Sequence, residues 1–352
     1  HETEIAAIIK MTQMGMPTVA IGPFATNFSQ AYLKAGASVI AGEPEMYFAC
    51  EDLDLDFIKK RPSLLQVEQT KSLDDLPYPA WDITFEELNT IHRFLAVSGP
   101  TIPIAATRGC PYSCSYYCTY PLQQGVKVRK RSPQKIVQEM IYWKEKLGVS
   151  NFIFRDPVFS IDRKHTLKLC EELSNANNEF KFAIETHLKN LDIEMVKKLR
   201  SVGLEMVYVG VESVDEDVMK NAKRATVSMD QQRKQIQILE ESGIKVKGLY
   251  ILGFPTDTIE SCLATMNYAM SLNTMYSQFN VFTPYPGTPN YQEHIDLITT
   301  ERLEDFTQYH FVFQHMNLTQ DKIRKLLDMA YRKYYTNPRW ILKHFGNLIV
   351  IL

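Results

Sequence analysis

The feature that most constrains the fold is a strand pattern followed by a helix pattern, repeated six times between residues 101 and 297. Apolar runs typical of buried strands occupy 102–107, 151–155, 180–185, 205–211, 245–252 and 277–282. Helical periodicity occupies 133–147, 163–176, 191–202, 215–222, 229–242 and 257–272. Strands that alternate with helices form parallel sheets. Because an eight-unit barrel needs roughly 250 residues, the pattern predicts an α/β fold with an open, partial (β/α)6 barrel.

Two further regions precede the barrel, and one follows it. Residues 1–60 carry strand patterns at 17–22 and 38–41 and helix patterns at 4–14, 29–35 and 45–53. Two strands are too few for a stable sheet, so we interpret this region as the second half of a Rossmann-like domain. Residues 61–100, with two prolines between Asp74 and Trp81, predict a linker. Residues 298–352 predict a helical C-terminal extension.

The composition narrows the functional class. The 352 residues carry a formal net charge of -2 and are 45% hydrophobic, which gives no reason to expect a nucleic acid or an anionic membrane as partner. No run of 18 apolar residues occurs, so we expect no membrane-spanning helix. The chain begins at His1 without an initiator methionine and stops within an apolar run, so we expect it to be part of a longer protein.

The cysteines point to a metal rather than to disulfides. Six are present, and three of them fall within nine residues. Such a set is a poor disulfide framework for so long a chain and a good metal-binding one, which predicts a cytoplasmic protein. Cys50, Cys170 and Cys262 stand alone, and we expect them to be small buried hydrophobic residues.

The clustered cysteines, Cys110, Cys114 and Cys118, directly follow the first barrel strand. They therefore sit at the C-terminal rim, where barrel enzymes place their chemistry. A structural zinc site takes four ligands, usually from two cysteine pairs, and no second pair is present. Three thiolates leave one iron of a four-iron cluster open, which suits a catalytic cluster. A zinc site completed by a distant histidine and a cysteine-rich loop without metal are the alternatives.

The segment from Thr107 to Pro121 resembles the cluster-binding loop of the radical S-adenosylmethionine (SAM) superfamily. Its surroundings are similar to the branch with an N-terminal cobalamin-binding domain, which includes anaerobic magnesium-protoporphyrin cyclases and hopanoid and phosphinate methylases. The turn at 283–289 and the string at 309–311 carry the same resemblance. The resemblance covers most of the chain, from the half-Rossmann region to the C-terminal extension.

This resemblance implies a radical SAM enzyme in which Cys110, Cys114 and Cys118 hold a [4Fe-4S] cluster and SAM chelates the open iron. One electron from the cluster cleaves SAM reductively to methionine and a 5′-deoxyadenosyl radical. The implied reaction is methylation or cyclisation at an unactivated carbon of a small-molecule substrate. An electron donor such as flavodoxin or ferredoxin is the implied protein partner.

The spacing of the cysteines departs from the family pattern. The family has Cys-x3-Cys-x2-Cys, whereas this chain has Cys-x3-Cys-x3-Cys, so either Tyr116 or Tyr117 is extra. The extra residue either bulges and leaves the thiolates in place, or it displaces Cys118 and makes the chain a degenerate, non-catalytic homologue. A methylthiotransferase-like enzyme is a further alternative, although that family has additional cysteines in a different N-terminal domain.

The resemblance also assigns cofactor contacts to residues at or near the barrel strand ends: Tyr117, Asp156, Glu185, Glu212, Ser213, Gly248 and Gly253. Tyr117 and the two glycines would lie near the adenine of SAM, since glycine lets a ligand approach the backbone closely. Glu212 and Ser213 suit ribose hydroxyls or an amino group. A loop or cap role for Asp156, a structural role for Glu185 and a simple bulge or turn for the glycines are the alternatives.

Cobalamin is a separate question. The loop that donates an axial histidine in the resembled branch has no counterpart here. The strand-end segments 22–26 and 42–45 match later loops of that domain, and they either line a corrin or form ordinary turns. We expect cobalamin only in the intact protein.

Two cations, Arg129 and Arg131, stand just before a good helix start at Ser132-Pro133. They either reach an anionic group of SAM or substrate, or they belong to a solvated loop.

Overall fold

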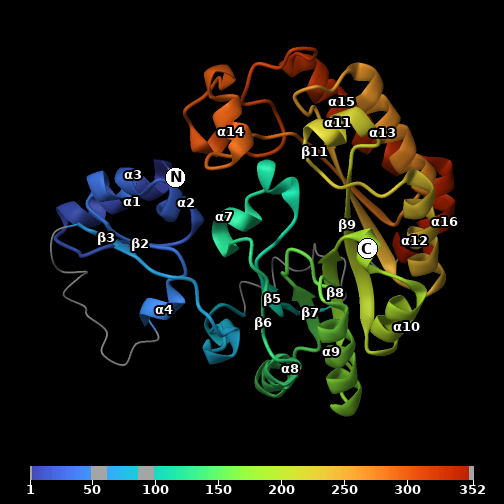
Figure 1. Ribbon diagram of the computed structural model, residues 1–352, viewed down its shortest axis with the longest axis horizontal. Coiled ribbons are helices and arrows are strands. Elements are labelled where there is room, and N and C mark those ends of the chain that lie inside the picture. The colour runs from blue at the N-terminus through green and yellow to red at the C-terminus, as the bar shows by residue number, and fades with distance from the viewer. Residues whose placement is uncertain (1, 49–61, 86–98, 349–352) are drawn as a thin grey trace.

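The computed structural model describes residues 2–48, 62–85 and 99–348 (Figure 1). Its largest element is a parallel sheet of six strands in the order β11-β10-β9-β8-β7-β4. The strands are β4 (Thr101–Ile104), β7 (Asn151–Phe154), β8 (Lys181–Thr186), β9 (Leu204–Glu212), β10 (Lys245–Leu252) and β11 (Tyr276–Val281). β4 and β11 form the two edges and do not pair with each other. The prediction of an open, partial parallel barrel is confirmed.

Helices connect successive strands and cover one side of the sheet (Figure 1). They are α8 (Pro133–Leu147), α9 (Arg163–Asn175), α10 (Ile193–Ser201), α11 (Glu216–Asn221), α12 (Met229–Glu241) and α13 (Ile259–Leu272). Their starts are locally encoded: Ser132 caps α8, and Thr258 and Ser261 form a reciprocal capping box on α13. Among the described helices, none is long and apolar enough to cross a membrane.

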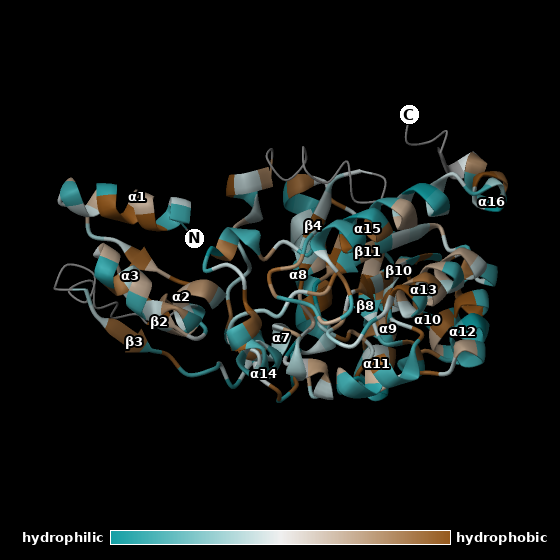
Figure 2. Cartoon of the chain, turned by 90° about the horizontal axis from the view of Figure 1, so that it is seen from above, coloured by the Kyte–Doolittle hydropathy of each residue, from teal (hydrophilic) through white to brown (hydrophobic). Residues whose placement is uncertain are grey.

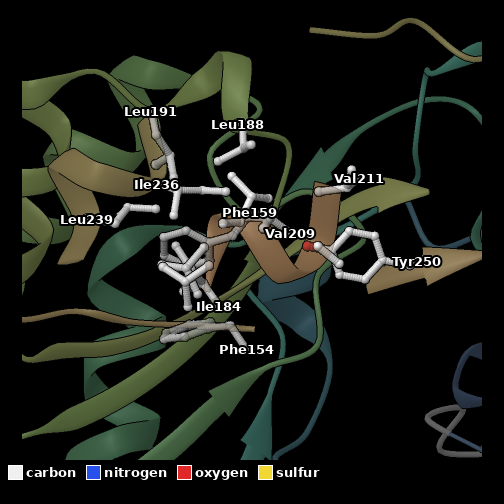
Figure 3. Packing of buried hydrophobic residues seen from close by; sticks show 14 of the residues in the cluster. Phe154, Phe159, Ile184, Leu188, Leu191, Val209, Val211, Ile236, Leu239 and Tyr250 are labelled. Atoms are coloured by element: carbon white, nitrogen blue, oxygen red, sulfur yellow. The ribbon is translucent and has the colours of Figure 1, made fainter. Parts of the chain in front are cut away.

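The main hydrophobic core lies between the sheet and these helices. Figure 3 shows part of it, with side chains from three neighbouring strands and from α12: Phe154, Ile184, Val209, Ile236 and Leu239. Cys170 and Cys262 are buried in the same layer, as predicted. Cys50 lies outside the described residues. Thus the apolar runs of the strands account for the core.

The first predicted strand, 102–107, is too long. β4 ends at Ile104, and the next pairing residues, Thr107–Arg108 (β5), form a small antiparallel ribbon with Arg129–Lys130 (β6). The chain leaves the sheet because the carboxylate of Asp156 accepts hydrogen bonds from the amides of Ala106 and Thr107. This departure starts the cysteine loop.

The N-terminal unit contains a parallel three-stranded sheet in the order β1-β2-β3 and stands beside the barrel (Figures 1 and 2). Its elements are α1 (Glu2–Gln13), β1 (Val19–Ala20), α2 (Pro23–Asn27), α3 (Ser29–Ala35), β2 (Ser38–Ala41), α4 (Glu45–Phe48) and β3 (Leu64–Gln66). β3 falls in the segment predicted to be a linker. It escapes sequence analysis because it has three residues, of which two are exposed. The end of the helix predicted at 45–53 lies outside the described residues.

Arg129 joins the N-terminal unit to the barrel. Its guanidinium binds Glu43 through Nη1–Oε2 at 2.8 Å and Nη2–Oε1 at 2.6 Å, and Glu43 also accepts the amide of Thr70 at 2.9 Å. Burial alone raises the pKa of Glu43, but the hydrogen bonds from Arg129 and Thr70 hold it below its ordinary value. Arg129 is therefore neither solvated nor available to a ligand. Arg131 is likewise paired, with Glu139 at 2.5 Å.

The C-terminal extension covers the β11 edge of the sheet with α15 (Gln320–Tyr335), and α14 (Pro289–Glu293) and α16 (Pro338–Leu348) flank it in sequence. Two tyrosines of α15 bind the backbone of β11. The Tyr335 hydroxyl accepts the amide of Ser277 at 3.0 Å and donates to its carbonyl at 2.9 Å. The Tyr331 hydroxyl pairs with Phe279 in the same way, at 3.1 and 3.0 Å. These hydroxyls thus make the backbone hydrogen bonds that a neighbouring strand would make with Ser277 and Phe279.

Removing one of these hydroxyls tests the arrangement. Tyr335→Phe leaves the buried backbone of Ser277 without its partner, which costs about 1–3 kcal/mol. We expect the free energy of unfolding, measured by urea denaturation, to fall by that amount. Tyr142→Phe, on the outer face of α8, is the control and should change it by less than about 0.5 kcal/mol. Equal values for both variants would show that the tyrosine contact adds nothing.

Candidate active site

The cysteine loop rises from β5 at one end of the sheet, and α7 (Tyr120–Gln124), which directly follows it, lies between the barrel and the N-terminal unit (Figure 1). The loop starts at Gly109, whose backbone has φ +96°. A side chain there would place its Cβ 2.1 Å from the carbonyl oxygen of Lys127, so only glycine fits. The amide of Cys110 then donates to the carbonyl of Gly125 at 3.0 Å. Both ends of the loop are thereby tied together.

Asp156 anchors the same loop from below. It is fully buried, and its carboxylate accepts the amide of Ala106 at 3.1 Å and, in a very short contact, that of Thr107. Burial raises its pKa to about 6, against the opposing effect of these hydrogen bonds. Sequence analysis left open a cofactor contact or a loop role for Asp156. The structure places it beneath the loop, where it binds the backbone.

The three cysteines line one cavity of about 110 Å³, together with Glu185, Glu212 and other side chains. Cys110 and Cys114 are buried and Cys118 is partly buried. A hydrogen bond joins the thiols of Cys114 and Cys118. In the described part of the chain, no group of three or more His, Cys, Asp or Glu side chains is arranged so that it could hold a single metal ion. The thiols thus share a cavity without surrounding one point in it.

The unusual cysteine spacing has a simple structural basis. A single 3-10 turn, η3 (Ser113–Tyr116), contains the second cysteine and ends two residues before the third. The amide of Cys118 donates to the carbonyl of Cys114 at 2.9 Å. Residues four apart in a helical turn lie on the same face. The additional residue therefore completes a turn that returns the third thiol to the second.

The two adjacent tyrosines point to different partners. Tyr116 is buried beside α14: its hydroxyl makes a very short hydrogen bond to Glu293, and the ammonium of Lys223 lies 3.9 Å from its ring centroid. Tyr117 lines the cysteine cavity and packs edge-on against Phe254 and Phe282, with ring centroids 5.6 and 5.9 Å away. Tyr116 therefore holds the turn in place, and Tyr117 forms a wall of the cavity.

Glu212 reaches the cavity through an irregularity at the end of β9. The pairing with β10 skips one residue, Val211, and Glu212 adopts φ +65°. A bulge of this kind re-aims a side chain, and a non-glycine residue at positive φ is strained. The Glu212 carboxylate lies 3.2 Å from the guanidinium of Arg224, which also donates to the carbonyl of Gly210 at 2.9 Å. Burial raises the pKa of Glu212, and Arg224 opposes this.

Glu185 is the second carboxylate of the cavity. It lies on β8, level with Tyr208 of β9, and burial raises its pKa to about 7. The positive charge of Arg155 acts in the opposite direction. Its neighbour His187 also lines the cavity, and burial lowers the pKa of this imidazole to about 4.

Besides Asp156, three further predicted contact residues do not line this cavity. Ser213 is buried and its hydroxyl lies 3.2 Å from that of Thr265 on α13. The space beside Gly248 is filled by Tyr250, whose hydroxyl lies 2.7 Å from the position a Cβ would take. Gly253, at φ +80°, is packed in the same way against Phe311 of the C-terminal extension. All three residues serve packing and turn geometry here.

Arg224 is the site residue that sequence analysis missed. It follows Lys223 in a polar segment after α11, where a cation usually faces solvent. Its side chain is only 13% exposed and lies between Glu212 and Cys114. Lys223, at φ +54°, turns the chain so that the two neighbouring cations point apart. No residue type or spacing in the sequence signals this turn.

The rings of Tyr117, Phe254 and Phe282 form an aromatic wall, and a second pocket lies on its far side. It measures about 330 Å³ and is lined by Tyr116, Phe254, Phe282 and residues of α14. The Phe254 and Phe282 rings stand 4.8 Å apart. The aromatic wall therefore has the cysteine cavity on one side and this aromatic pocket on the other.

Comparison with known proteins gives this geometry a context. Residues 104–269 match the family model described as the radical SAM superfamily. The chain is 25% identical over 285 residues to an uncharacterized methyltransferase of Pyrococcus horikoshii, covering 79% of this chain and 61% of that protein. It is 27% identical over 301 residues to bacteriochlorophyllide d C-12(1)-methyltransferase of Chlorobaculum tepidum, covering 85% and 64%. The chain thus spans less than two thirds of either relative.

A third relative and two solved structures extend the comparison. The anaerobic magnesium-protoporphyrin IX monomethyl ester cyclase of Cereibacter sphaeroides is 28% identical, over 80% of this chain and 45% of that protein. The radical SAM methyltransferase TsrM of Kitasatospora setae, solved with cobalamin and a [4Fe-4S] cluster, has a TM-score of 0.53 at 21% identity and covers 56% of this chain and 37% of that one. The cobalamin-dependent SAM radical enzyme OxsB has a TM-score of 0.58 at 14% identity, covering 96% and 45%. These two structures show that the fold is shared.

Asp156→Ala tests the anchor beneath the loop. Without the carboxylate, two buried amides lose their acceptor, and we expect the free energy of unfolding to fall by about 2–5 kcal/mol. Asp156→Asn keeps one acceptor oxygen and should lose roughly half as much. Urea denaturation of the reduced protein measures both. If Asp156→Ala lowers the free energy of unfolding no more than Asp156→Asn does, Asp156 is not an anchor of the loop.

Tyr116→Ala tests whether this side chain fixes the third cysteine. Loss of the buried ring should destabilise the turn by about 3–5 kcal/mol and expose Cys118 to reagents. We expect alkylation of Cys118 by iodoacetamide, followed by mass spectrometry of the reduced protein, to become faster. Tyr309→Ala, at an exposed position, is the control and should leave the rate unchanged. An unchanged rate in Tyr116→Ala would mean that the turn holds without its anchor.

Proposed function

We propose, from the premise that this chain carries a radical SAM domain at residues 104–269, that it is a radical SAM enzyme that methylates or cyclises a small molecule at an unactivated carbon. The observation that carries the proposal is the meeting of three cysteine thiols in one cavity with a buried Glu212–Arg224 pair. The similar methyltransferases and cyclase support the reaction class.

Cys110, Cys114 and Cys118 are the residues that would hold a [4Fe-4S] cluster. The donor set fits, because a cluster of this kind takes thiolate ligands and three thiols from one short loop open into one cavity. When bound, the cluster supplies the single electron that cleaves SAM to methionine and a 5′-deoxyadenosyl radical. The protein contributes ligation, orientation and exclusion of water.

The Glu212–Arg224 pair suits the amino-acid end of SAM. A carboxylate and a guanidinium at the same wall complement an ammonium and a carboxylate of the ligand. Because Gly210 lies beneath the pair, with room for no Cβ, the two side chains are held in one arrangement. Glu185 faces the same cavity and can accept a hydrogen bond from the ligand or, when protonated, donate one.

The aromatic wall suits the nucleoside end of SAM. Tyr117 is shared between the cysteine cavity and the rings of Phe254 and Phe282, and aromatic rings stack favourably with a planar base. We place the adenine there. Ser213, Gly248 and Gly253 are left out of the proposed SAM site, since their surroundings are already filled by protein atoms.

Cobalamin belongs to the proposal for the intact protein. Residues 1–60 together with β3 resemble part of a cobalamin-binding-type domain, and both the TsrM and the OxsB structures contain cobalamin. Within the described residues, Gly22 faces open space, whereas a Cβ on Gly42 would lie 2.2 Å from the carbonyl oxygen of Val67. The Gly22 segment therefore has open space beside its backbone, whereas the Gly42 segment is closely packed. A flavodoxin or ferredoxin as electron donor and a cytoplasmic location complete the proposal.

Anaerobic reconstitution tests the proposed function. We expect the wild-type protein to bind about four iron atoms per chain, to show a reduced-cluster electron-spin signal that changes on adding SAM, and to release 5′-deoxyadenosine. Cys114→Ala should lose the SAM-dependent signal and the product. Cys170→Ala, which alters a buried cysteine of α9 outside the site, is the matched control and should retain both. Colourless wild-type protein would instead identify a non-catalytic homologue.

A further inference from the structure

A cavity of about 200 Å³ lies between the segment 73–81 and the β4 edge of the barrel. Its walls are mainly apolar, and its apolar residues include Leu73, Leu76, Pro77, Pro79, Pro103 and Ala105. We call it the edge cavity. It shares no lining residue with the cysteine cavity, so it is a separate space on the barrel.

Three arginines border the edge cavity, and two of them are already paired. Arg108 forms ion pairs with Glu45 at 2.6 Å and Glu43 at 3.5 Å. Arg131 binds Glu139 at 2.5 Å and the carbonyl of Ala105 at 3.1 Å. These contacts also occupy the acceptors of the cavity, namely the Glu139 carboxylate and the Ala105 carbonyl. The paired groups therefore leave little for a ligand to bind.

Arg155 differs from its neighbours. It directly follows β7, and within the described part of the chain its guanidinium has no hydrogen bond or ion pair. Trp81, which also lines the edge cavity, has a buried indole N–H that lacks an acceptor among the described residues. Arg155 is exposed, so water can solvate it, whereas the buried indole donor of Trp81 without an acceptor costs about 1–3 kcal/mol. Both free polar groups of the edge cavity are donors, so its ligand has to bring acceptors.

Arg155 also connects the edge cavity to the active site. It lines the edge cavity and stands two residues before Pro157, which lines the cysteine cavity, and its charge acts on Glu185 in that second cavity. A molecule whose acceptor group binds Arg155 would therefore lie next to the space where the proposed chemistry takes place. This position suits a substrate better than a structural ligand.

We propose that the edge cavity binds the substrate, a mainly apolar molecule with a carboxylate that pairs with Arg155 and accepts from the Trp81 indole. The planar guanidinium matches a carboxylate through two parallel hydrogen bonds, and the proline and leucine wall takes the apolar body. This substrate class rests on the proposed function, because it uses the neighbourhood of the cysteine cavity. The binding itself does not need the cluster or SAM.

Binding to the cluster-free, full-length chain isolates this inference. The probes are octanoate and the neutral 1-octanol, which share a chain length and differ in the carboxylate. We expect titration calorimetry to give an affinity for octanoate at least about tenfold above that for octanol. Arg155→Gln should abolish this difference and leave octanol binding unchanged. Arg332→Gln, an exposed arginine of α15, is the matched control and should behave as wild type.

A second variant keeps the test independent of Arg155. Trp81→Phe preserves an aromatic wall but removes the indole donor, and it should weaken octanoate by about three- to tenfold without weakening octanol. Equal affinities of the wild-type protein for the two probes overturn the inference, as does octanoate binding that neither variant weakens. Either of these results overturns the inference but not the proposed function, because SAM cleavage is measured separately. If octanoate binds selectively but the reconstituted protein does not cleave SAM, the proposed function alone is overturned.

Discussion

The buried carboxylate of Asp156 is the constraint on which the rest of the site depends. By accepting the amides of Ala106 and Thr107, it ends the first barrel strand early and diverts the chain into the cysteine loop. A carboxylate is placed in the interior at a considerable cost in solvation, and here the hydrogen bonds from the loop offset part of that cost. The thiols, Tyr117 and the aromatic wall all take their positions from that change of direction.

The barrel was largely predictable from sequence, because each strand is a buried apolar run and helix starts such as Ser132 carry their own caps. The errors have physical causes. The strand predicted at 102–107 was too long because a residue some fifty positions away binds its end. β3 was missed because it is short and mostly exposed. Neither role considered for Arg129 was correct, because its partner, Glu43, lies far away in sequence.

The site was predictable where its chemistry is local. Three cysteines within one loop predict that their thiols share a cavity. The structure explains the extra residue between Cys114 and Cys118 as the completion of a turn. Arg224 was not predictable, since its position depends on a bulge, a positive φ at Glu212 and the turn at Lys223. Gly248 was predicted to contact the ligand, but the side chain of Tyr250, two residues along the strand, fills the space beside it.

The tyrosine contacts on β11 also determine what the outer edge of the sheet offers to other molecules. With α15 docked, the hydroxyls of Tyr331 and Tyr335 occupy hydrogen-bonding groups that an outer strand otherwise offers to any neighbour. With α15 detached, the same groups become a template on which strands of other molecules can assemble. The C-terminal extension thus closes an edge of the sheet that is otherwise open to strand addition.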